Sequence, residues 1–76
     1  MFTLAMLREG QEARVVTVIG GRGAIRNLMA IGIVPGKRVK VLGRRGGAML
    51  VSVDGTKYVL GRGLAMRVVV DVKEKI

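Results

Sequence analysis

The sequence predicts a small, mainly β domain with one short helix, and three features of the chain support this prediction. Runs rich in valine and other β-branched residues recur along the 76 residues, as is typical of strands. Glycine is abundant, with 12 residues, and most of them stand between these runs, where tight turns need them. Only one stretch, residues 25–36, carries apolar residues at helical spacing.

The first strand is expected at residues 11–19, which are mostly small or β-branched. The alternation of apolar and polar residues fails at Val15-Val16 and again at Val18-Ile19. This failure indicates either a β-bulge or partial burial of both faces of the strand. A short apolar lead-in at residues 3–7 precedes the strand, and its leucines are expected to close one end of the core. Gly20-Gly21 ends the strand.

The expected helix begins at Ile25 and presents one apolar stripe. The stripe consists of Ile25, Leu28, Met29 and Gly32, at positions i, i+3, i+4 and i+7. We expect this stripe to face the core. Ile31 then lies away from the stripe, and both Ile31 and Val34 are either exposed at the surface or covered by the apolar lead-in.

The end of the helix is marked by a glycine and a turn. Gly32 is expected to adopt the left-handed conformation that ends a helix, and Ile33 to fold back as the apolar contact of this cap. Pro35-Gly36 suits the two central positions of a type II turn. The segment therefore predicts a helix, a stop, a turn and then a strand.

Four further strands are expected after this turn. They cover residues 37–44, 48–54, 57–60 and 67–73, the last centred on a run of valines. In residues 37–44 the alternation places Val39 and Val41 on the core side and Arg44 on the outer side. Asp54-Gly55 is a strong signal for a hairpin turn. A 3₁₀ turn is expected at Leu64-Ala65.

About five short strands joined by tight turns are most stable when their sheet curls on itself, because closure leaves few unpaired edges. We therefore predict a single SH3-like β-barrel domain over residues 1–76, with the helix between the first and second strands and residues 73–76 as a tail. The chain has no cysteine, so an aliphatic core must stabilise the domain without disulfides.

The composition argues against catalysis and against a tight metal site. The chain has no histidine and no cysteine, and its five acidic residues are scattered along the sequence. No pair of them has a nucleophile–base relation. Ferrous iron prefers histidine, carboxylate and thiolate ligands. We therefore predict that the chain is not an enzyme and has no catalytic residue, no cofactor and no metal-binding residue.

The charge of the chain indicates anionic partners. Its 14 lysine and arginine residues against 5 acidic residues give a net charge of +9. Such a surplus favours nucleic acid, an anionic lipid surface or an acidic protein face. The N-terminal stretch does not have the pattern of a signal peptide, and no apolar run approaches the roughly 20 residues that a membrane span needs. A cytoplasmic location is expected.

Several motifs occur in order along residues 3–72. They are Leu4-x-x-Leu7-x-x-Gly10, Ala13-x-Val15-x-x-Val18, Gly20-Gly21, Leu28-x-x-Ile31-Gly32-x-x-Pro35-Gly36 and Val39-x-Val41. With these motifs the chain resembles the FeoA family, ferrous iron transport protein A. The segment that ends at Pro35-Gly36 is the most specific part of the similarity. The family implies an SH3-like β-barrel, in agreement with the strand pattern.

This resemblance implies an accessory or regulatory protein of ferrous iron uptake. By the same resemblance, the partner is the membrane transporter FeoB, on whose cytosolic GTPase part the protein docks, so that it is peripheral to the inner membrane only through this partner. Met6 and Met66 stand where the family more often has polar residues, which adds apolar surface for a partner or for self-association. The residues predicted to bind the partner are Ile31, Val34, Arg26, Met66 and Met6.

A basic SH3-like barrel that binds nucleic acid is the alternative. Only Phe2 and Tyr58 are available to stack on bases, however, and single-stranded nucleic acid is usually bound through several aromatic side chains. Docking on a FeoB-type GTPase is therefore preferred, and nucleic acid is not the expected partner. A weak contact with anionic lipid is a further prediction, and it would assist docking to a membrane protein.

Overall fold

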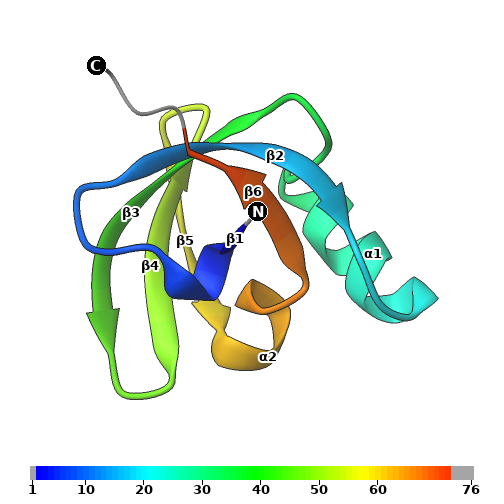
Figure 1. Ribbon diagram of the computed structural model, residues 1–76. Helices are drawn as coiled ribbons and strands as arrows, with labels where there is room; N and C mark the ends of the chain where they lie inside the picture. Colours follow the sequence, from blue (N-terminus) through cyan, green and yellow to red (C-terminus); the bar gives the residue numbers. More distant parts are fainter. Residues whose placement is uncertain (1, 73–76) are drawn as a thin grey trace.

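The computed structural model describes residues 2–72 and contains one six-stranded antiparallel sheet with short helical segments (Figure 1). The strands are β1 (Phe2–Thr3), β2 (Glu12–Val18), β3 (Arg38–Arg45), β4 (Ala48–Val53), β5 (Thr56–Gly61) and β6 (Val68–Asp71). The helical segments are η1 (Leu4–Met6), α1 (Arg22–Ala30) and α2 (Arg62–Ala65). The predicted mainly β fold, with its helix between the first two long strands, is confirmed.

Two details of the predicted elements differ from the structure. The sheet has six strands instead of about five, because residues at the start of the expected lead-in pair with β6 as the two-residue strand β1. The expected 3₁₀ turn at Leu64-Ala65 belongs to α2, a single α-helical turn. The predicted tail, residues 73–76, lies outside the described residues.

The sheet follows the order β1-β6-β2-β3-β4-β5, so that β1 and β5 are its two end strands. The segment η1 packs against β6 and α2, and α2 packs against β4 and β5. These two short helical segments therefore join the two ends of the curled sheet (Figure 1). They complete the barrel at the position where direct strand pairing stops.

The core inside this sheet is aliphatic. Val39 and Val41 of β3 are buried as predicted, and along β4 alternate residues are buried, with Val51 completely inaccessible to solvent. The buried residues are Leu4, Leu7, Ala13, Val15, Leu28, Ile33, Val39, Val41, Met49, Val51, Val53, Leu60, Ala65, Val68 and Val70. Both leucines of the lead-in contribute to this core, which confirms their predicted place.

Two local predictions about the strands are confirmed. The register between β2 and β6 shifts between Val15 and Thr17, so that Val16 is the extra residue of a bulge. Asp54 and Gly55 have φ angles of 52° and 81°. Positive φ at both central residues is characteristic of the type I′ hairpin turn, which matches the twist of the flanking strands.

The predicted orientation of the helix is wrong at Met29. The side chain of Met29 is 56% exposed, whereas Leu28 is 1% exposed, and Ile25 and Ile31 are half-buried. The helix also begins at Arg22, earlier than predicted. Its buried face is centred on Leu28, and because each residue turns the helix by about 100°, Met29 points to solvent while Ile31 returns to the buried side.

The predicted end of the helix is confirmed. Gly32 has a φ of 89°, and its backbone N–H donates to the carbonyl of Met29 at 3.0 Å. The N–H of Ile33 donates to the carbonyl of Leu28 at 2.9 Å. These two hydrogen bonds form a Schellman cap, in which an apolar residue after the glycine contacts the last turn of the helix. Ile33 accordingly enters the core.

Candidate functional site

The structure places the five predicted partner-binding residues in two groups. Ile31 and Val34 are half-buried near the C-terminal end of α1, and Ile31 packs against the core. Arg26 is exposed on the same helix. Met6 and Met66 belong to the second group, beside β6, and they are 61% and 52% exposed. In the first group only Ile31 is shown to pack against the core, whereas both methionines of the second group are more than half exposed.

The second group extends over the outer side of the sheet around β6. The sulfur of Met6 accepts a hydrogen bond from the backbone N–H of Thr3 at 3.4 Å, so that its side chain folds back over β1. Thr3 lies opposite Val69 in the pairing of β1 with β6. Val69 is flanked along the chain by two buried valines, and it therefore points to the outer face of the strand.

The other side of β6 adds a further apolar residue. The backbone N–H of Ile19 donates to the carbonyl of Arg67 at 2.8 Å, so that Ile19 lies beside the start of β6. Ile19 is 50% exposed. We define the β6 face as Met6, Ile19, Met66 and Val69. This part of the surface is mostly apolar, but it includes the exposed Arg67 beside Ile19 and the exposed Thr17 opposite Val69. Exposed patches with several apolar side chains often mark protein-binding sites.

Methionine suits such a surface for a physical reason. Its unbranched, polarisable side chain adapts to partners of different shape. The sequence indicated the exposure of Met6 and Met66, but it did not indicate that Ile19 and Val69 lie with them. The failed alternation at Val18-Ile19 was the available signal, since it showed that both faces of β2 carry apolar side chains.

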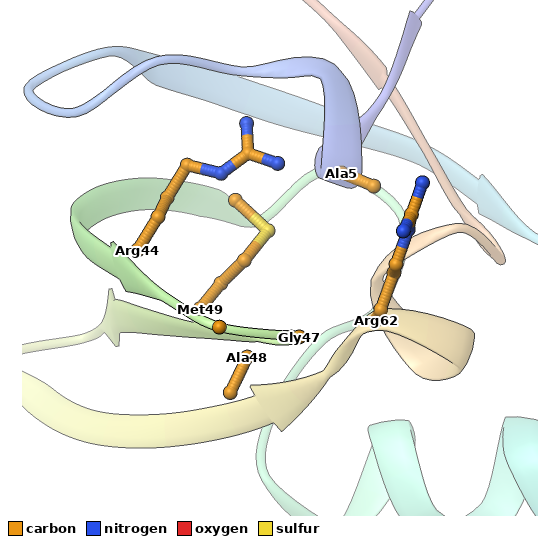
Figure 2. Close-up of a pocket in the computed structure, with 7 residues that line it drawn as sticks. Ala5, Arg44, Gly47, Ala48, Met49 and Arg62 are labelled. Carbon is orange, nitrogen blue, oxygen red and sulfur yellow. The ribbon is translucent and has the colours of Figure 1, made fainter.

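A second feature, missed by the sequence prediction, is a small pocket where the β3–β4 turn meets η1 and α2. It is lined by Ala5, Arg44, Gly46, Gly47, Ala48, Met49 and Arg62. Figure 2 shows Arg44 and Arg62 on opposite sides of Met49, both extending toward the turn that carries Ala5. The prediction that Arg44 lies on the outer side of its strand is wrong, because β3 contains a bulge before it.

Within residues 2–72, no group of three or more aspartate, glutamate, histidine or cysteine side chains is arranged to hold a metal ion. No helix of the described residues has both the length and the apolar character that crossing a membrane requires.

Met29, in the last turn of α1, and Ile31, just after it, differ in burial, and this difference gives a stability prediction. We expect Ile31→Gln to lower the free energy of unfolding by about 1–2 kcal/mol, because Ile31 packs against the core. We expect Met29→Gln to change it by less than about 0.5 kcal/mol, because Met29 is largely in solvent. Urea denaturation of both variants measures this. Equal losses would contradict the placement of the buried face.

Comparison with known proteins identifies close relatives along almost the whole chain. The model of the FeoA domain family matches residues 2–72. A Fe(2+) transport protein A of Methanocaldococcus jannaschii is 37% identical over 71 residues, which cover 93% of this chain and 87% of that protein.

Two solved structures have the same fold. The crystal structure of an iron uptake regulatory protein, FeoA, superposes with a TM-score of 0.85 and 34% identity, covering 92% of this chain and 93% of that one. The zinc complex of Stenotrophomonas maltophilia FeoA, described as a prokaryotic SH3 domain protein, gives a TM-score of 0.83 and 31% identity, covering 93% and 91%. The SH3-like fold predicted from the strand pattern is thus confirmed.

Proposed function

The chain belongs to the FeoA domain family, and on this basis we propose that it is an accessory protein of ferrous iron transport that docks on the cytosolic GTPase part of a FeoB-type membrane transporter. The family match over residues 2–72 is the observation that carries this proposal. Ferrous iron is the cargo of the transporter in this view, and this chain acts on the transporter instead of carrying the ion itself.

The β6 face supports a docking role. Three of its apolar side chains are at least half exposed. A few central residues usually carry most of the affinity of a protein interface, and a small exposed face of this kind is therefore compatible with docking. The proposed location follows: the protein is cytoplasmic and reaches the membrane surface through its partner.

The nucleic-acid alternative receives less support from the positions of the aromatic residues. Tyr58 is half-buried and packs against the core, so that its ring is not free to stack on a base. Phe2 is 45% exposed and stands alone at the end of β1. Binding to nucleic acid would therefore depend on phosphate contacts, and it would weaken steeply with salt.

The test is a calorimetric titration of this protein with the purified cytosolic GTPase part of the FeoB-type transporter from the same organism. We expect micromolar binding, and we expect the double variant Met6→Gln, Met66→Gln to bind about tenfold or more weakly. Val59→Gln is the matched control, because Val59 is a 71% exposed apolar residue outside the β6 face.

Two outcomes would count against the proposal in different ways. If the unmodified protein does not bind at any practical concentration, and deletion of its gene leaves ferrous iron uptake unchanged, the docking function is wrong. If binding occurs but Val59→Gln weakens it as much as the double variant does, the function stands and the β6 face is not the docking site.

A further inference from the structure

The pocket between the β3–β4 turn, η1 and α2 has no role in the docking function proposed above. Its volume is about 170 Å³, and two of its lining residues are arginines (Figure 2). Its remaining wall consists of small residues and one methionine. Pockets that take whole metabolites usually measure about 300–1,000 Å³. This pocket therefore has room for one side chain of a larger partner.

A β-bulge directs Arg44 into this pocket. Between Val41 and Gly43 the register of β3 against β4 shifts, so that Leu42 has no direct opposite residue. Beyond the bulge Arg44 lies opposite Met49, which is 3% exposed and faces the core. One extra residue reverses the side to which all later side chains point. The bulge thus places Arg44 on the same side of the sheet as Met49, where its side chain remains exposed to solvent.

The orientation of Arg44 is then held by a hydrogen bond. Its Nη1 donates to the backbone carbonyl of Leu7 at 3.0 Å. A guanidinium group carries five N–H donors, so this contact orients the group and leaves most of its donors available. An arginine fixed in this way loses less side-chain entropy when it binds a ligand.

Arg62 provides the second cation from the other side. Its backbone N–H donates to the carbonyl of Gly47 at 2.7 Å, which ties the start of α2 to the β3–β4 turn. Gly46 and Gly47 carry no side chain, and the positions that a Cβ would take there have no atom within 4 Å. The two glycines line the pocket between the arginines without adding side chains to it.

Neither arginine is neutralised within the described part of the chain. The ion pair found among residues 2–72 joins Lys37 and Asp54, with 3.0 Å between Nζ and Oδ2. Asp54 follows the far end of β4, whereas the pocket is at Ala48, where this strand begins. The two arginines therefore form an uncompensated positive site in a protein of net charge +9.

We propose that this pocket binds the carboxylate of an acidic side chain in an otherwise apolar peptide segment of the docking partner. Guanidinium groups match the planar geometry of a carboxylate with paired hydrogen bonds. Met49 and the two alanines of the wall contact the methylene groups of the same side chain. The role of this contact in docking rests on the proposed function, whereas the affinity of the pocket for a carboxylate does not.

The affinity for a carboxylate is tested by NMR titration of the ¹⁵N-labelled protein with the peptide acetyl-Leu-Glu-Leu-amide. We expect saturable shifts of the Arg44 and Arg62 side-chain Nε–H signals and of the Gly47 amide. The same peptide with glutamine in place of glutamate is expected to cause none. In Arg62→Gln we expect at least a fivefold loss of affinity.

Arg38→Gln is the control for net charge. Arg38 is exposed on β3 before the bulge, and the substitution removes the same charge away from the pocket. An equal loss in Arg38→Gln would overturn the site, because the binding would then be general electrostatic attraction.

Inorganic phosphate is titrated in parallel. If phosphate shifts these signals at a lower concentration than the peptide does, the assignment of the pocket to a carboxylate is overturned. Thermal melting of both variants checks that they fold.

The role in docking is tested separately with the GTPase part of the transporter. We expect Arg62→Gln to weaken its binding at least fivefold and Arg38→Gln to leave it within twofold. If Arg62→Gln docks normally although it has lost the peptide, the pocket is not part of the docking surface, and the proposed function stands. If the unmodified protein does not dock, the proposed function fails, and the peptide titration still decides the pocket.

Discussion

Replacing Ile33 with alanine is expected to destabilise the domain by about 3 kcal/mol, within the range of 2–5 kcal/mol that is typical for truncation of large buried side chains. Ile33 is completely inaccessible to solvent. Its backbone N–H donates to the carbonyl of Leu28 in the cap at the end of α1, and its side chain provides the apolar residue of this cap. The variant therefore leaves a cavity and weakens the attachment of the helix.

The size of the domain makes this loss serious. At about 0.05–0.15 kcal/mol per residue, a domain of 76 residues is stable by only about 4–11 kcal/mol. Urea denaturation followed by circular dichroism measures the change. Val59→Ala is the control, because Val59 is 71% exposed and its truncation should cost less than about 0.5 kcal/mol. A loss below about 1 kcal/mol in Ile33→Ala would contradict the tight packing of this site.

Replacing Gly32 with alanine is expected to cost about 1–2 kcal/mol, because a residue with a Cβ is strained in the left-handed conformation. Gly32 has a φ of 89°. The only atom near the position of an added Cβ is Cγ1 of Val53 at 3.6 Å, which is an ordinary van der Waals distance. The cost therefore comes from the backbone and not from a collision.

Two matched variants separate this cause from others. Gly32→Asn should cost less than Gly32→Ala, because asparagine tolerates the left-handed region better than most residues. Gly23→Ala, inside α1, should stabilise the protein by up to about 1 kcal/mol, since Gly23 has helical geometry and an added Cβ meets no atom within 4 Å. If both alanine variants change stability in the same direction, the conformational explanation is wrong.

These two positions also bear on docking. Gly32 and Ile33 hold the end of α1, and this end carries Ile31, the residue that the sequence prediction placed first among the partner-binding residues. Because Ile31 packs against the core, a loss of partner binding in an Ile31 variant would reflect a loss of structure. The β6 face and the arginine pocket are better sites for mutations that test partner binding, since their side chains are exposed or line an open cavity.

Much of the fold could be predicted from local patterns. The alternation in residues 48–54, the Asp54-Gly55 turn and the glycine after the helix each depend on a few adjacent residues. Their conformations are set by local sterics, which the sequence alone expresses. The bulge in β2 was also indicated, because the alternation of its side chains fails at the bulge.

The two failed predictions of side-chain orientation, at Met29 and Arg44, depend on contacts between distant parts of the chain. The apolar residues of α1 are compatible with more than one buried face, and the packing of Leu28 and Ile33 into the barrel decided that Met29 is outside. The alternation in β3 breaks at Val41-Leu42, where the bulge lies, but this break alone does not show to which side the later residues point. The register with β4 shows the bulge, which turns Arg44 toward the pocket.

The sequence by itself determined the fold class, the family and five of the six strands along the chain, because turn chemistry and side-chain alternation are local properties. The tertiary structure decided which side chains meet. Met6, Ile19, Met66 and Val69 form one face only because β1 and β2 both pair with β6. Arg44 and Arg62 form one pocket only because the register of β3 and the closure of the barrel by α2 bring them together.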